Sequence, residues 1–196
     1  FIVVQDIFHT ETTQFADVIL PAASFAEKNG TFVNSDRRVL RVRKVVDSPG
    51  LAHQDWQIIL DIAERMGKPM KKYVDESEIF DEIALVTPIM AGINYKRLEK
   101  GSIQWPCYDL EHPGTSTLFL EKFNTPNGKA KINPVDYVPQ NEKVSDEYPF
   151  LLNSGRILFQ YHSATMSRKN DTLNAFANKS YVLMHPNDAN KHNFSD

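Results

Sequence analysis

Two short apolar runs stand at the start of the chain, separated by a more polar stretch. Residues 1–5 form one of these runs, which is typical of a strand buried on both faces of an α/β sheet. Residues 17–21 predict a second buried strand that ends at its proline, and residues 10–15 predict a short helix between them. Ligands of open α/β sheets lie beyond the carboxyl ends of such strands, so the polar residues there are candidate ligand contacts.

The helical period is clearest over residues 55–66. The apolar positions that share one face of this helix are Trp56, Ile59, Leu60, Ala63 and Met66. Asp55 stands where an N-cap would, and Gly67 ends the helix. A second helix is predicted over residues 76–86, and it ends there because a proline follows shortly afterwards.

The amino-acid composition and the hydrophobic pattern change twice after residue 99. Residues 100–147 are rich in Pro, Gly, Asn and Asp, which indicates a surface connection that contributes no core. Apolar strand patterns return at residues 150–152 and 181–184. The sequence therefore predicts an α/β domain over residues 1–99, a wrapping connection, and the start of a β-barrel domain over residues 148–196.

Composition excludes several classes of protein. The chain has 196 residues, a formal net charge of -3 and 41% hydrophobic residues, as in an ordinary soluble protein. These values argue against a disordered chain and a basic nucleic-acid-binding domain. No apolar run approaches the roughly 20 residues that span a bilayer. The chain starts inside an apolar run without Met and stops after a predicted short helix, so we expect both ends to be cuts through a longer protein.

The sequence shows no catalytic constellation. Its six histidines have no metal-ligand spacing, and Walker A and Gly-x-Gly-x-x-Gly motifs are absent. The single cysteine, Cys107, excludes a disulfide framework and a cysteine-ligated cluster built from this chain. No histidine stands beside it in the sequence to activate it, so we interpret Cys107 as a buried structural thiol.

Residues 31–46 predict extended structure and carry a basic run. Its members are Arg37, Arg38, Arg41, Arg43 and Lys44. The run is either a solvated strand face, which we favour, or a contact for a phosphate or an acidic partner.

Residues 153–156 predict a tight turn after a buried strand. Gly155 permits a turn with exposed backbone amides, which suit phosphate oxygens, and Arg156 can form a forked contact with a phosphate. Further polar side chains follow at Gln160, His162 and Ser163. This run of donors indicates anion or nucleotide binding.

Several motifs occur in the order of one known family. They are Gln5-Asp6-Ile7-Phe8, Ala16-Asp17-Val18-Ile19-Leu20-Pro21, Glu27-Lys28-Asn29-Gly30, Asp55-Trp56, Ile103-Gln104-Trp105-Pro106-Cys107, Phe123-Asn124-Thr125-Pro126 and Ser154-Gly155-Arg156. In these motifs the chain resembles the molybdopterin oxidoreductases of the dimethyl sulfoxide reductase superfamily. The motifs at 103–107 and 123–128 are similar to the formate dehydrogenase branch, and the likeness covers essentially the whole chain.

The resemblance implies a part of a formate dehydrogenase catalytic subunit. Such a subunit interconverts formate and carbon dioxide with molybdenum or tungsten on a bis-molybdopterin guanine dinucleotide cofactor, and it carries a [4Fe-4S] iron-sulfur cluster. The metal ligand, cluster cysteines and catalytic residues would lie upstream of Phe1, so this segment would hold cofactor only. The implied fold is the end of a Rossmann-like α/β domain followed by the start of a double-psi-type β-barrel. The implied partners are iron-sulfur electron-transfer subunits, with a hydrogenase as a further candidate, in the cytoplasm.

The resemblance also implies a set of cofactor-binding residues. They are Gln5, Asp6, Ala22, Lys28, Asp55, Ser154, Gly155, Arg156, Ile157, Leu158, Gln160, Tyr161, His162 and Ser163. Two positions depart from close formate dehydrogenases, which often have His at the position of Gln160, and one of which has Glu at that of Ile157. The plainer alternatives are that Asp55 is only an N-cap, Lys28 a surface charge and Gln5 a strand-end residue.

Two other functional classes compete with the enzyme. The large peripheral-arm subunit of respiratory complex I resembles this superfamily but works without a pterin. A free-standing nucleotide-binding module is the third interpretation, and it conflicts with the expected cuts at both ends. The presence of Asp55 and of the polar run 154–168 favours the enzyme.

The first prediction concerns Arg156. In the full-length subunit, Arg156→Ala is expected to lower pterin content at normal iron content, because a broken Arg–phosphate fork costs on the order of 2–5 kcal/mol, about thirtyfold or more in affinity. Arg156→Lys is expected to be intermediate. Pterin and iron per purified subunit measure the effect, and Arg41→Ala in the basic run is the control. Full pterin content in Arg156→Ala would contradict the phosphate role.

Overall fold

The structure is a computed structural model that describes residues 1–195. The chain divides into two compact units, residues 1–131 and residues 132–195 of the described part, and each is described by itself. The strands of the first unit are β1 (Val3–Asp6), β2 (Val18–Pro21), β3 (Gly30–Val33), β4 (Arg38–Val42) and β5 (Ile103–Gln104). Its helices are α1 (Asp55–Arg65), α2 (Glu76–Val86) and α3 (Tyr95–Leu98), with short 3-10 helices η1 (Glu11–Phe15), η2 (Phe25–Glu27) and η3 (Pro88–Met90).

Strands β1 and β2 form a parallel pair in which Val3 lies opposite Val18 and Asp6 opposite Pro21. The two strands and the short helix η1 between them are therefore confirmed. Their expected burial on both faces is wrong, because Val3 is 49% exposed and Val18 38% exposed. Within residues 1–195 no third strand pairs with them, and burial on both faces requires a larger, covered sheet.

The chain that leads into α1 joins the end of β2. His53 forms a parallel bridge with Ala22: the His53 amide donates to the Pro21 carbonyl (3.1 Å), and the Ala23 amide donates to the His53 carbonyl (2.8 Å). Asp55 follows two residues later as the first residue of α1. The bridge therefore fixes the N-terminus of α1 beside the carboxyl end of β2.

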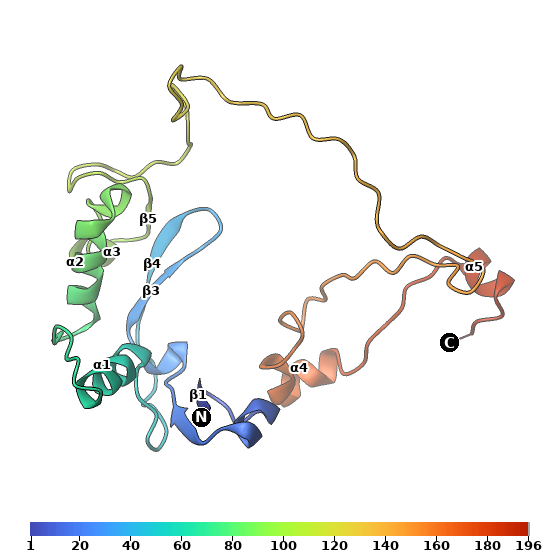
Figure 1. Cartoon of the computed structure of the whole chain (residues 1–196), viewed down its shortest axis with the longest axis horizontal. Coiled ribbons are helices and arrows are strands. Elements are labelled where there is room, and N and C mark those ends of the chain that lie inside the picture. Colours follow the sequence, from blue (N-terminus) through green and yellow to red (C-terminus); the bar gives the residue numbers. More distant parts are fainter. Residues whose placement is uncertain (196) are drawn as a thin grey trace. The chain divides into compact units, whose positions relative to one another are not determined.

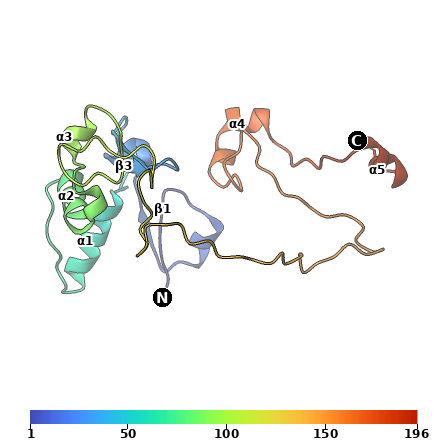
Figure 2. The ribbon, with the colours of Figure 1, turned by 90° about the horizontal axis from the view of Figure 1, so that it is seen from above.

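The core of the first unit lies against a second sheet. Strands β3, β4 and β5 pair antiparallel in that order, and helices α1, α2 and α3 lie on one side of the β3–β4 hairpin (Figures 1 and 2). The buried cluster consists of Val39, Phe80, Ile93, Leu98, Ile103 and Cys107. Cys107 is fully buried, which confirms its interpretation as a structural thiol.

The first part of the segment 100–147 belongs to this core. Ile103 pairs with Val39 across the sheet, and the Cys107 amide donates to the Ile89 carbonyl at 2.7 Å. The expectation that this segment contributes no core is therefore wrong for residues 103–107. Loop composition shows where regular structure ends, but an irregular segment can still bury an isoleucine and a cysteine when its backbone finds partners.

The two long helices form nearly where the sequence predicts them. Asp75 caps α2 by accepting from the Ser77 amide at 2.9 Å. In α1 the predicted buried face is confirmed in part: Trp56, Leu60 and Ala63 are half-buried. It is wrong for Ile59, which is 53% exposed, and for Met66, which is 74% exposed, and Ile58 is the buried residue of the helix. Periodicity predicts that an apolar stripe exists, but only a neighbouring element can cover it.

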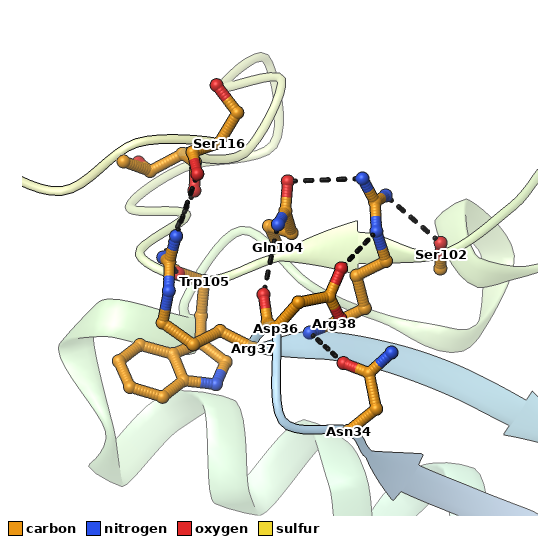
Figure 3. Close-up of polar contacts among 9 residues, drawn as sticks. Asn34, Asp36, Arg37, Arg38, Ser102, Gln104, Trp105 and Ser116 are labelled. Carbon is orange, nitrogen blue, oxygen red and sulfur yellow. Dashed lines mark hydrogen bonds and ion pairs between the residues drawn. The ribbon is translucent and has the colours of Figure 1, made fainter.

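Two arginines of the basic run join the β3–β4 hairpin to β5 and the chain on either side of it (Figure 3). Arg37 donates to the carbonyls of Trp105, Thr115 (3.1 Å) and Ser116 (2.9 Å). The Arg38 guanidinium lies among Asp36, Ser102 and Gln104, and it donates to all three of them. The favoured interpretation of this run as a solvated strand face is therefore wrong for these two side chains, because neighbouring carbonyl and side-chain oxygens satisfy their donors.

The second unit contains three short helices: η4 (Ser167–Lys169), α4 (Asp171–Phe176) and α5 (Pro186–Lys191). No strand forms within residues 132–195, so the strands predicted at 150–152 and 181–184 are wrong for this structure. The predicted turn at 153–156 is also absent, and these residues are exposed coil. A strand needs a partner for its backbone N–H and C=O groups, and these two segments do not pair with each other.

The second prediction concerns Gly92. A Cβ atom at this residue would lie 1.9 Å from the Asp109 carbonyl oxygen and 2.8 Å from the Cys107 sulfur. Gly92→Ala is therefore expected to destabilise the first unit by about 3 kcal/mol, since backbone must move in a packed region. Thermal unfolding of the full-length subunit measures this effect. The matched control is Gly30→Ala, whose Cβ would meet nothing within 4 Å. Equal melting temperatures for the two variants would contradict the close packing of Gly92 against Asp109 and Cys107.

Candidate binding site

Three residues far apart in the sequence meet at the N-terminus of α1. The Gln5 side-chain amide donates to Oδ1 of Asp55 at 2.7 Å. The Lys28 ammonium donates to Oδ2 of the same carboxylate and forms an ion pair with it. All three residues belong to the predicted cofactor-binding set, so the structure brings this part of the set together.

Each of these side chains is positioned by a defined local structure. Gln5 lies near the carboxyl end of β1, and Asp55 is the first residue of α1. Lys28 directly follows η2, whose N-terminus is capped by a capping box between Ser24 and Glu27. A strand end, a capped 3-10 turn and a helix N-terminus therefore converge on one carboxylate.

The surroundings of Asp55 favour its charged form. Desolvation raises the pKa of the Asp55 carboxyl, but hydrogen bonds from Lys28 and Gln5, together with the Lys28 charge, outweigh it, and the pKa lies below its ordinary value. The positive end of the α1 dipole also stabilises an anion at this place. The Asp55 side chain is 46% exposed, so the paired carboxylate still presents surface to a ligand.

A hollow of about 230 Å³ opens beside the ion pair. Its lining residues are Lys28, Asn29, Gly30, Thr31, Asp55, Trp56, Glu76, Ile79, Phe80, Ile83 and Tyr95. Charged groups therefore border a wall of aromatic and aliphatic side chains. Such a combination suits a flat ligand that stacks on a ring and carries N–H donors for a carboxylate.

Asp6 and Ala22 lie at the neighbouring strand ends. Oδ1 of Asp6 accepts from the Phe8 amide (3.1 Å), and the Asp6 carbonyl accepts from the Ala22 amide (3.1 Å). Ala22 is buried at 7% exposure, and only its backbone can make polar contacts because its side chain is a methyl group. These two predicted residues therefore extend the strand-end edge on which Gln5 lies.

The remaining predicted residues belong to the second unit, where most are exposed. These exposed residues are Ser154, Gly155, Arg156, Ile157, Leu158, Tyr161, His162 and Ser163. Gln160 differs, because it is buried at 6% exposure: its amide donates to the Ala177 carbonyl (2.9 Å), and its oxygen accepts from the Ser167 hydroxyl (2.6 Å). The Gln160 side chain thus stabilises its own unit, and residues 154–156 are not preorganised by a turn.

Sequence reasoning missed the role of Arg41. Its guanidinium carbon lies 3.7 Å from the centroid of the Tyr95 ring, and its side chain is only 11% exposed. Arg41 is therefore not the solvated control that the sequence suggests for Arg156, and the exposed Lys179 in the second unit serves instead. The aromatic lining was also missed, although Trp56 directly follows Asp55 and could have drawn attention to an aromatic wall.

Within residues 1–195, no three His, Cys, Asp or Glu side chains gather to hold a metal ion. In the same described part of the chain, every helix is too short or too polar to cross a bilayer. The side chains that meet at Asp55 offer a carboxylate acceptor, an ammonium donor and a stacking surface.

The family models match both ends of the chain. The model of the molybdopterin oxidoreductases matches residues 1–65, and that of the molydopterin dinucleotide binding domain matches residues 150–196. Both ends of the chain thus match molybdopterin-related domains, which confirms the resemblance seen in its motifs.

Several similar proteins are formate dehydrogenases. The chain is 48% identical to the F420-dependent formate dehydrogenase 2 subunit alpha of Methanococcus maripaludis, over 96% of this chain and 28% of that protein. It is 49% identical to the F420-dependent formate dehydrogenase subunit alpha of Methanocaldococcus jannaschii, with the same coverage. Formate dehydrogenase H of Escherichia coli is 41% identical over 100% of this chain and 28% of its own length. The chain thus spans under a third of these relatives.

A solved structure shares the fold. Acetylene hydratase from Pelobacter acetylenicus aligns over 98% of this chain and 28% of its own, with a TM-score of 0.62 and 20% sequence identity. At this identity the likeness supports the mixed α/β fold.

The third prediction concerns pH. Because the Asp55 pKa is lowered in the folded chain, its contribution to stability is present above the ordinary value of 3.8 and is lost as the pH falls through the lowered pKa. Lys28→Met is expected to lower the melting temperature of cofactor-free full-length subunit at pH 5–8. The expected loss in the free energy of unfolding is about 1 kcal/mol or less, since the pair is half exposed. The difference is expected to shrink below pH 3.8.

Melting temperatures measured across this pH range test the prediction. The exposed Lys68→Met is the control, and in an Asp55→Asn background Lys28→Met should have no pH-dependent effect. A difference that grows toward acid pH would contradict a lowered pKa of the Asp55 carboxyl.

Proposed function

We propose that this chain is the cofactor-binding part of a formate dehydrogenase catalytic subunit. The observation that carries the proposal is the meeting of Gln5, Lys28 and Asp55 beside an aromatic-lined hollow. The family models and the similarity to formate dehydrogenase alpha subunits support it. The whole protein would interconvert formate and carbon dioxide and pass two electrons to an iron-sulfur relay.

The residues of the site fit a molybdopterin guanine dinucleotide. The Asp55 carboxylate can accept the paired N–H donors of a guanine edge, and the adjacent ring surfaces can stack on the base. The Lys28 ammonium can contact a phosphate, and the Gln5 amide holds the carboxylate in orientation. When bound, the cofactor's molybdenum or tungsten centre supplies the two-electron chemistry.

The second unit would bind another part of the cofactor. We infer that the segment 154–163, which is exposed apart from Gln160, supplies backbone amides and the Arg156 guanidinium to a pyrophosphate or a pterin. The match to the dinucleotide binding domain supports this assignment. Because the segment is coil here, it would become ordered on contact with the cofactor or with other parts of the subunit.

The finer architecture follows from the same proposal. Residues 1–99 would end a Rossmann-like domain, 100–147 would connect it, and 148–196 would begin a double-psi-type β-barrel whose strands pair with further segments of the subunit. A [4Fe-4S] cluster would be bound elsewhere in the subunit. The assembly would work in the cytoplasm with iron-sulfur subunits, and a hydrogenase is a further candidate partner. Similarity to formate dehydrogenases gives no support to the complex I alternative.

The fourth prediction tests the cofactor site. Asp55→Asn in the full-length subunit is expected to lower guanine nucleotide and pterin content about tenfold or more, because the amide loses charge and offers donors where the guanine edge needs acceptors. Iron content is expected to stay near normal. Pterin, acid-released guanine nucleotide, metal and iron per subunit are the measurements.

Asp61→Asn is the matched control, since Asp61 is exposed on the same helix. Equal pterin in both variants would remove Asp55 from the binding site. Absence of both molybdenum and tungsten from wild-type protein made in a competent host would overturn the proposed function itself.

A further inference from the structure

The wall of the hollow is supported from outside by one side chain of the basic run. Arg41 lies on β4 directly opposite Thr31 of β3, and Thr31 lines the hollow. Its Nη1 atom donates to the Gly30 carbonyl (3.4 Å), and its guanidinium carbon lies 3.7 Å from the centroid of the Tyr95 ring. Gly30 and Tyr95 are lining residues as well. Arg41 therefore contacts lining residues on both β3 and α3.

The Tyr95 ring lies between the Arg41 guanidinium and the buried cluster. Tyr95 packs against the buried cluster, and its ring centroid lies 6.0 Å from that of Phe80, another lining residue. A guanidinium over an aromatic face is attracted by the ring quadrupole, and the attraction grows when the cation is shielded from water. The low exposure of Arg41, 11%, meets that condition.

A second arginine offers a natural comparison. Glu99 accepts from Nε of Arg41 (3.2 Å) and from Nη2 of Arg43 (2.6 Å). Arg43 is 54% exposed and does not line the hollow. The two side chains therefore share an ionic partner, but only Arg41 reaches the Tyr95 ring.

We propose that Arg41 is a positioning residue of the ligand pocket: it fixes the Tyr95 ring and the start of β3 as two walls and so sets how firmly a flat base is held. The inference rests on the proposed function, because the flat base would be the guanine of the cofactor. Arg41 acts through Tyr95 and Gly30 and makes no contact with the ligand itself. Lysine keeps the charge for Glu99 but lacks the planar group that covers the ring.

The test compares dissociation of the intact dinucleotide cofactor from loaded full-length enzyme at a temperature well below melting, with the released cofactor quantified by its guanine nucleotide after acid hydrolysis. Arg41→Ala is expected to release it about fivefold faster than wild type, the scale of a shielded cation–π contact. Arg41→Lys is expected to lie between them, and Arg43→Ala to match wild type. Iron content is expected to stay unchanged, because the iron-sulfur cluster would be bound elsewhere in the subunit.

A double-mutant cycle with Tyr95→Leu separates positioning from general loss of stability. If Arg41 acts through the Tyr95 ring as well as through Gly30, Arg41→Ala has a clearly smaller effect on release in the Tyr95→Leu background than in wild type. Three results would overturn the inference. The first is that the effects of Arg41→Ala and Tyr95→Leu on the release rate multiply in full in the double variant. The others are wild-type release in Arg41→Ala and equal release in Arg41→Ala and Arg43→Ala. If Asp55→Asn retains the nucleotide, the proposed function fails at this site; if it loses the nucleotide and Arg41→Ala does not, only the positioning role fails.

Discussion

The parallel bridge between Ala22 and His53 is the constraint on which the candidate site depends. Its two backbone hydrogen bonds join the end of β2 to the chain just before α1. A helix N-terminus carries free N–H groups and a partial positive charge, and the bridge places that end beside the carboxyl ends of the parallel strands. Asp55 can then meet Gln5 and Lys28, although each lies more than 25 residues away in sequence.

The arginines of the basic run show how charge is used inside an irregular unit. Arg37 donates to carbonyls of the segment after β5, and Arg38 donates to the side chains of Ser102 and Gln104. Arg97, which lies outside the basic run, donates in the same way to the chain around Cys107, with the His112 carbonyl at 2.7 Å. A planar guanidinium with five donors can bond to several oxygens at once. Long loops thereby become fixed with little regular hydrogen bonding of their own.

The two units differ in how far they are organised. The first unit has a buried cluster and two separate β-sheets. Its predicted cofactor residues Gln5, Lys28 and Asp55 meet at the N-terminus of α1. The second unit keeps large apolar side chains exposed, among them Leu152 at 89% and Leu183 at 96%. Its predicted site residues lie on coil and turns, and all of them except Gln160 are exposed.

Local pattern in the sequence determined the elements whose stability is local. The strands at the start of the chain, the two long helices and the burial of Cys107 follow from apolar runs, helical period and flanking Gly or Pro. The motifs also pointed to Gln5, Lys28 and Asp55, but only as separate residues. Contacts across tens of residues decided the rest: which face of α1 is buried, which part of the segment 100–147 enters the core, and that Arg41 covers Tyr95. These outcomes depend on what lies opposite each side chain, and a one-dimensional pattern carries no information about the partner.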